Sequence, residues 1–206
     1  MEVTQNAAIT DIINPSLSNG ITYSDYRTLV KTLVENKSTT GHDKSEAMAN
    51  YTMLNDRRMN RWDKMVKVSD EAKRRLSNFD GNITWLVITE SWCGDAAHVV
   101  PVIYKIADLH NGIGLKLVMR DDNEALMNQF LTNGGKAIPK LIMIDNNSGE
   151  VLDTFGPRPS AATKMVQDYK AEHGKLTSEF KEDLQRWYNK DKGQTVIDDL
   201  LKLLKV

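Results

Sequence analysis

The chain has 206 residues, of which 40% are hydrophobic and 27% are charged, a composition typical of a globular protein. That length suits one domain with additions, or two small domains. With 27 basic against 28 acidic residues, the net charge of −1 gives no overall field that would favour nucleic acid or an anionic membrane as a partner. The single cysteine excludes an intramolecular disulfide, a dithiol active site and a multi-cysteine metal site within one chain.

The first twenty residues show no sign of an export signal. They contain neither a basic stretch nor an apolar core, and no run in the chain approaches the length of a membrane span. We therefore expect a cytoplasmic protein with no membrane partner. Because residues 1–20 are rich in Asn, Ser, Thr and Gly, we expect them to form a loosely held arm.

Three helices are expected between residue 22 and residue 78. Thr22 and Ser45 are typical N-cap residues, and Ser69 precedes two acidic residues that suit a third helix start. The helix after Ser45 carries one apolar face, which Arg58 interrupts. The members of that face are Ala47, Tyr51, Leu54, Trp62, Met65 and Val66.

The middle of the chain alternates strands and helices. Residues 83–89 form a β-branched apolar run typical of a strand that is buried on both faces. A helix to about residue 110 follows, then a strand over 115–119, a helix over 123–131, and two strands over 139–145 and 151–155 joined as a hairpin. A helix after residue 159 and two further helical stretches close the chain. The predicted fold class is α/β, with a mixed sheet flanked by helices.

The single cysteine lies where a reactive thiol would be expected. Cys93 joins the first buried strand to the next helix, and a helix N-terminus stabilises a thiolate. This position predicts a thiol pKa of roughly 7–8. The alternative is that Cys93 is a small buried apolar residue with no chemical role.

The sequence around Cys93 resembles the active-site turn of the thioredoxin family. Trp92-Cys93-Gly94 matches the start of the family's Trp-Cys-Gly-Pro-Cys motif, and Pro101 stands where thioredoxins carry a proline inside the active-site helix. The Ile138-Pro139 step resembles the family's cis-proline, and Gly156 follows the hairpin. More narrowly, Trp-Cys-Gly-Asp-Ala is similar to a bacterial branch of thioredoxin-like proteins with one active-site cysteine.

This resemblance implies a thioredoxin fold with helical additions at both ends. We expect a thioredoxin-like domain over residues 79–172, with residues 1–78 as an N-terminal arm and helical extension packed on it, and residues 173–206 as a C-terminal helical extension. The chain departs from the family at Ala96, where the resolving cysteine would stand, and at Val87, which replaces a buried acid. Any disulfide exchange would therefore need an external thiol.

Two functions remain open at this stage. The first is a monothiol thiol-disulfide oxidoreductase that forms a mixed disulfide at Cys93 with a protein disulfide or a low-molecular-weight thiol. In that function Trp92, Ile138 and Pro139 would hold the partner, while Gly94 and Asp95 would shape the helix start. The second is a redox-inactive module that uses the same groove to bind an extended peptide. The sequence does not reveal the oligomeric state.

The neighbours of Cys93 receive separate interpretations. Asp95 is expected to stabilise the helix N-terminus more than to act as a base. His98 is expected to point away from the thiol. Arg158, in a rigid turn between two prolines, could meet a carboxylate, but we expect it to be a solvated turn residue. The four histidines show no ligand spacing, so we expect neither a metal nor another cofactor.

Overall fold

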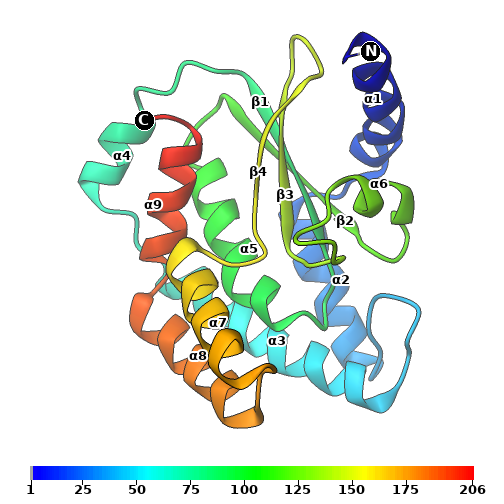
Figure 1. Cartoon of the computed structure of the whole chain (residues 1–206), viewed down its shortest axis with the longest axis vertical. Helices are drawn as coiled ribbons and strands as arrows, with labels where there is room; N and C mark the ends of the chain where they lie inside the picture. The colour runs from blue at the N-terminus through cyan, green and yellow to red at the C-terminus, as the bar shows by residue number, and fades with distance from the viewer. Residues whose placement is uncertain (1) are drawn as a thin grey trace.

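The computed structural model describes residues 2–206, and in these a mixed four-stranded sheet is flanked by helices (Figure 1). The strands are β1 (Ile83–Thr89), β2 (Ile113–Met119), β3 (Lys140–Asp145) and β4 (Val151–Phe155), in the order β2-β1-β3-β4. β1 runs parallel to β2 and antiparallel to β3, and β3 pairs with β4 in an antiparallel hairpin. The expected α/β class and mixed sheet are confirmed.

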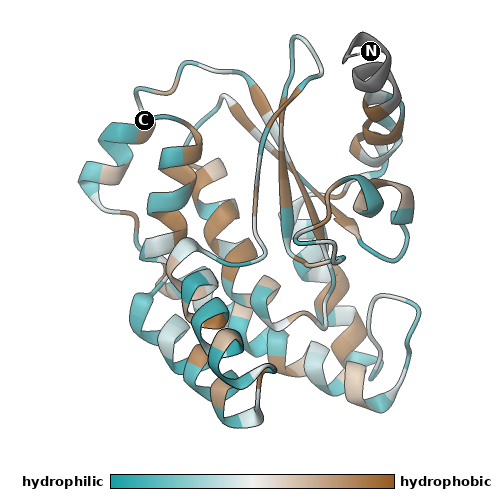
Figure 2. Ribbon diagram, in the orientation of Figure 1, coloured by the Kyte–Doolittle hydropathy of each residue, from teal (hydrophilic) through white to brown (hydrophobic). Residues whose placement is uncertain are grey.

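β1 forms the centre of the core because its side chains are buried on both faces. Trp85, Leu86, Val87 and Ile88 are all inaccessible to solvent. Burying such a β-branched run is the main stabilising contribution of a central strand. Figure 2 shows the strands and the inner faces of the helices as the most hydrophobic parts of the structure.

The helices before the sheet are α1 (Glu2–Asn19), α2 (Tyr23–Glu35), α3 (Glu46–Met65) and α4 (Asp70–Leu76). Thr22, Ser45 and Ser69 each accept a backbone N–H as N-caps of α2, α3 and α4, as the sequence indicated. The expectation of a loose arm over residues 1–20 is wrong. Most of this segment is helix α1, because Ile13 packs into the core and the Ser16 hydroxyl donates to Asn123 Oδ1 at 2.9 Å.

The expected apolar face of α3 is also wrong in part. Tyr51, Leu54 and Met65 are exposed, whereas the buried residues of α3 are Thr52, Asn55, Met59 and Trp62. The polar residues Thr52 and Asn55 can face inward because they hydrogen-bond to Ser91, at the turn after β1. The helix is therefore rotated relative to the face that its apolar residues suggest.

The remaining helices are α5 (Gly94–Ala107), α6 (Glu124–Gln129), α7 (Ser160–His173), α8 (Ser178–Asp191) and α9 (Gln194–Leu203). α5 contacts α3 on one side and α9 on another. In Figure 1, α3 and α8 lie toward the end of the sheet at which β1 leads into α5. Both helical extensions therefore approach the turn that carries Cys93. No helix of the described chain is long and apolar enough to cross a membrane.

Candidate functional site

Cys93 is the N-cap residue of α5. Its Sγ accepts a hydrogen bond from the Ala96 backbone N–H at 3.5 Å and donates one to the Ile138 carbonyl oxygen at 3.2 Å. The residue is only 8% exposed. The thiol thus has a defined acceptor for its proton, which favours the neutral form.

The electrostatic surroundings of Cys93 oppose ionisation. Burial raises the pKa of the Cys93 thiol to about 12, and the charge of Asp95 contributes in the same direction. The backbone N–H groups of Ala96 and Asp95 and the guanidinium of Arg158 lower the pKa by less. The expected pKa of 7–8 is therefore corrected: the helix N-terminus does act in the expected direction, but desolvation outweighs it.

Trp92 is half-buried beside the thiol. The guanidinium carbon of Arg120 lies 4.8 Å from its ring centroid, and Gly41 of the loop before α3 packs near its Nε1. Gly41 has a φ of +77°, and a Cβ there would lie 2.6 Å from Asp121 Oδ2, so only glycine suits this position. Trp92 is therefore held by the loop and by Arg120.

Gly94 opens the first turn of α5, next to the guanidinium of Arg58. A Cβ at this position would meet only Nη1 of Arg58 within 4 Å, at 3.5 Å. The guanidinium of Arg58, from α3, therefore lies over the start of α5. Because glycine has no side chain, this position leaves room for a cavity beside Cys93.

Ile138 and Pro139 lie opposite the thiol, at the start of β3. The peptide bond between them is cis, and both residues are buried. A second cis peptide bond, which was not predicted from the sequence, joins Gly156 to Pro157. The Ile138 carbonyl oxygen accepts the hydrogen bond from Cys93.

Asp95 is held by residues from two other segments. Arg158 Nη2 lies 2.5 Å from one carboxylate oxygen, and the Tyr188 hydroxyl donates to the other at 2.9 Å. Burial raises the pKa of Asp95, while Arg158 and Tyr188 act against that shift. The expectation that Arg158 is a solvated turn residue is wrong, because the turn before α7 brings it onto Asp95.

His98 points away from the thiol, as expected, and bridges the two extensions. Its Nδ1 accepts from Trp62 Nε1 of α3 at 2.7 Å, and its Nε2 lies 2.9 Å from Gln185 Oε1 of α8. The ring also stacks on Tyr188. Burial lowers the pKa of His98 to about 4, so the side chain is neutral at physiological pH.

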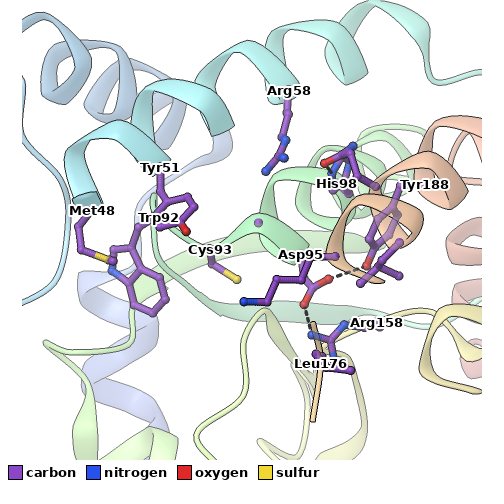
Figure 3. A pocket seen from close by; sticks show the side chains of 14 residues that line it. Met48, Tyr51, Arg58, Trp92, Cys93, Asp95, His98, Arg158, Leu176 and Tyr188 are labelled. Atoms are coloured by element: carbon purple, nitrogen blue, oxygen red, sulfur yellow. Dashed lines mark hydrogen bonds and ion pairs between the residues drawn. The ribbon is translucent and has the colours of Figure 1, made fainter. Parts of the chain in front are cut away.

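These residues surround a cavity of about 440 Å³ that opens beside Cys93 (Figure 3). Four segments distant in sequence form its walls: α3, the turn into α5, the turn before α7, and the C-terminal extension that includes α8. Figure 3 shows Arg58 pointing down from α3 towards Cys93, with Asp95, Arg158 and Tyr188 on the other side. The lining residues are Met48, Tyr51, Arg58, Trp92, Cys93, Gly94, Asp95, His98, Arg158, Leu176, Lys181, Leu184, Gln185 and Tyr188.

Comparison with known proteins gives a family and a fold. The family model described as Thioredoxin matches residues 41–170, which is more than half of the chain. The chain belongs to the thioredoxin-like family. The matched region includes α3 and α4 as well as the sheet. No curated protein matches the chain.

Two solved structures share the thioredoxin-like fold of this chain. One is a protein of unknown function from Pseudomonas aeruginosa, with 17% identity and a TM-score of 0.58, covering 76% of this chain and 90% of that one. The other is an HIV epitope scaffold, with 17% identity and a TM-score of 0.58, covering 90% of this chain and 98% of that one. At this identity the likeness concerns the fold alone.

The thioredoxin-like core differs from the family pattern at two buried positions. Ala96 stands where the resolving cysteine is expected; its side chain is buried and its backbone N–H is bonded to Cys93 Sγ. Val87 replaces the family's buried acid and is inaccessible within β1. In residues 2–206, no group of His, Cys, Asp and Glu side chains is arranged to hold a metal ion.

A buried hydroxyl cluster ties the thioredoxin-like turn to the N-terminal extension. Ser91 Oγ lies 2.8 Å from Thr52 Oγ1 and 3.2 Å from Thr39 Oγ1, and it accepts from the Thr40 backbone N–H at 3.0 Å. Asn55 Nδ2 donates to the Ser91 carbonyl at 2.9 Å. These bonds fix α3 and its preceding loop against the residues that lead to Cys93.

Sequence reasoning missed the most distant contributors to the site. Tyr188 is 93 residues away from its partner Asp95, and nothing local in the sequence signals that contact. Arg58 did carry a signal, because it interrupts an otherwise apolar helical face. Glu90, buried with one carboxylate oxygen unpartnered, was also missed, and burial raises its pKa.

Proposed function

We propose that this thioredoxin-like protein is a binding protein whose cavity beside Cys93 takes a small molecule, with Cys93 present as a neutral thiol in the wall. The observation that carries the proposal is the hydrogen bond from Cys93 Sγ to the Ile138 carbonyl, made in a buried setting. With its pKa raised to about 12 by burial, the Cys93 thiol is almost entirely protonated at pH 8. Disulfide exchange requires the thiolate.

The cavity walls support a small molecule more than an extended peptide. A cavity of about 440 Å³ falls within the range of small-molecule sites. Its apolar side chains come from three separate segments, which include both helical extensions.

A monothiol oxidoreductase is the second candidate, and the N-cap position of Cys93 in an open cavity favours it. In that function the Cys93 thiolate would attack one sulfur of a disulfide. A mixed disulfide would form, and the other sulfur would leave as a thiolate. A second, external thiol would then attack the mixed disulfide and restore Cys93, so its substrate would be a protein disulfide or a low-molecular-weight disulfide.

Alkylation of the only cysteine distinguishes the two functions. We expect the rate of reaction with iodoacetamide to keep rising between pH 6 and pH 10 without levelling, because the thiol remains largely protonated throughout. We also expect no mixed disulfide after incubation with an oxidised low-molecular-weight thiol at pH 7.5. A plateau below about pH 8.5, together with a mixed disulfide, would support the oxidoreductase and overturn our proposal.

A pocket-filling variant tests binding itself. Phenylnaphthylamine is a neutral aromatic probe that fluoresces when it enters an apolar site. Because a Cβ on Gly94 would meet only Nη1 of Arg58, at an ordinary contact distance of 3.5 Å, Gly94→Leu would enter the cavity without a backbone clash. We expect the probe to bind the wild-type protein and to be lost from Gly94→Leu, with Gly94→Ala as the matched control that retains most binding. Equal binding to all three proteins would place the probe elsewhere and contradict a cavity function.

A further inference from the structure

Three cationic side chains line the cavity, and only one of them is neutralised. Arg158 is paired with Asp95 at 2.5 Å. Among the ion pairs of residues 2–206, none involves Arg58 or Lys181. The lining therefore contains three cations and one carboxylate, that of Asp95, and His98 is neutral. Two positive charges remain without a partner in the cavity wall.

Arg58 is held in place, yet most of its donors are unused. Its Nη1 donates to Asn55 Oδ1 at 2.9 Å, and Asn55 Nδ2 in turn donates to the Ser91 carbonyl. The guanidinium is thereby fixed to the turn that carries Cys93. A guanidinium has five N–H donors. Within the part of the chain that the structure describes, Arg58 donates only to Asn55 Oδ1, so its other donors can bind a ligand.

Placing the charged guanidinium of Arg58 at this partly buried position costs free energy unless an anion lies beside it. Arg58 is half-buried, and burial lowers its pKa, which means that its charge is partly stripped of water. Asp95 is the carboxylate whose charge acts on Arg58 and raises the pKa of that guanidinium. The Asp95 carboxylate, however, is already bound by Arg158 and Tyr188. An anionic ligand would supply the missing partner for Arg58.

We propose that the ligand of this cavity is a small organic acid. Its carboxylate or sulfonate is held by Arg58 and Lys181, and its apolar body packs against the aromatic side chains of Tyr51 and Trp92. The inference rests on the proposed function, since it requires that the cavity bind a ligand. Arg58 provides the fixed, forked donor over Gly94, and Lys181 provides a flexible charge on the exposed side of α8. Tyr51, which is 50% exposed on α3, and Trp92 offer faces for the apolar body.

Two probes with the same ring system separate charge recognition from apolar packing. Anilinonaphthalene sulfonate carries an acidic group that phenylnaphthylamine lacks. We expect Arg58→Gln to weaken sulfonate binding by about tenfold, because a charged hydrogen bond in a partly desolvated site is lost. Binding of the neutral probe should change by less than about twofold. Arg58→Lys, which keeps the charge but loses the fork, should recover part of the loss.

Arg57→Gln is the matched control, since Arg57 is the neighbouring arginine on the exposed face of α3 and does not line the cavity. It should leave both dissociation constants unchanged. If Gly94→Leu abolishes binding of both probes but Arg58→Gln weakens neither, or weakens both equally, the cavity function stands and the anion site is wrong. If neither probe binds the wild-type protein, or Gly94→Leu has no effect, the proposed function fails and this inference fails with it.

Discussion

Trp62 Nε1 donates a hydrogen bond of 2.7 Å to Nδ1 of His98, and both side chains are buried. The other ring nitrogen, Nε2, lies 2.9 Å from the amide oxygen of Gln185. Since that oxygen only accepts, Nε2 carries the ring proton, and Nδ1 is the unprotonated nitrogen that accepts from Trp62. A neutral His98 thus joins α3 to α8 through α5, and a second proton on the ring would break the bond to Trp62.

This arrangement predicts that acid destabilises the protein through His98. The pKa of His98 is lowered to about 4 in the folded chain, against an ordinary value of 6.5. Between these two values the unfolded chain binds a proton that the folded chain does not, so the free energy of unfolding falls as pH falls. The loss should approach about 3 kcal/mol near pH 4.

Urea unfolding of the wild-type protein and of His98→Gln between pH 4 and pH 7.5 would measure this effect. Carboxylates titrate in the same range in both proteins, so the difference between the two curves isolates His98. We expect that difference to shrink as pH falls, because the wild type alone loses the histidine contribution. Parallel curves would show that the pKa of His98 is the same in the folded and the unfolded chain, so that burial does not keep its ring neutral.

The sheet was predictable because its strands are short apolar runs bounded by turn residues. The expected strand over 83–89 coincides with β1, and the capping residues Thr22, Ser45 and Ser69 mark the true helix starts. Local pattern failed at α3, where Thr52 and Asn55 face inward. Their partner Ser91 is more than thirty residues away, and no periodicity in α3 reveals it.

The chemistry of Cys93 was harder to predict than its position. The spacing of Trp92, Cys93 and Pro139 placed the turn correctly, but the pKa depends on burial and on the Ile138 carbonyl. Part of that burial comes from the two extensions, which the family resemblance did not cover. Arg158 appeared to be a solvated residue because its partner Asp95 is distant in sequence and no local pattern links the two.

Removal of the Asp95 charge should make Cys93 more acidic. Asp95 raises the pKa of the thiol, and Arg158, which lowers it, would lose its partner in Asp95→Asn. Both changes favour the thiolate, so we expect the pKa of Cys93 to fall by about one unit or more. The pH dependence of alkylation measures this shift. Asp70→Asn, a change at an exposed acid on α4, serves as the control and should leave the profile unchanged.

An unchanged pKa in Asp95→Asn would mean that burial alone keeps the Cys93 thiol protonated. Because Arg158 is left without its carboxylate, the variant must first be shown to fold by circular dichroism and by its melting transition. If it is destabilised, the alkylation profile should be recorded well below that transition.

Ser91→Ala should loosen the attachment of the N-terminal extension. The hydroxyl is buried among Thr39, Thr40 and Thr52, so its loss leaves the Thr40 backbone N–H without its acceptor and takes one partner from each threonine hydroxyl. We expect a loss of about 2 kcal/mol in the free energy of unfolding. The Thr40 amide, which donates to Ser91 Oγ, should exchange its hydrogen faster. Ser77→Ala, at an exposed site, should change stability by less than about 0.5 kcal/mol, and a similar cost at both sites would contradict the cluster's role.

Two glycines with positive φ provide a test of how α9 packs on α5. Gly193, at the start of α9, has a φ of +79° and lies in the left-handed region, where alanine costs about 1–2 kcal/mol. Gly174, at the end of α7, has a φ of +74° and a ψ of −41°, so alanine is strained there too, by its own amount. They differ in space: a Cβ on Gly193 would lie 2.8 Å from Val102 Cγ2 of α5, whereas one on Gly174 would meet no atom within 4 Å.

Gly193→Ala should therefore carry, besides its backbone strain, about 1–3 kcal/mol of overpacking against Val102. Chemical denaturation of both alanine variants, each in the wild-type and in a Val102→Ala background, would measure this part. In the Val102→Ala background the clash is removed, so the penalty of Gly193→Ala should fall by that amount, while the penalty of Gly174→Ala, which does not touch Val102, should stay the same. An unchanged penalty for Gly193→Ala would show that the start of α9 is not pressed against Val102 of α5.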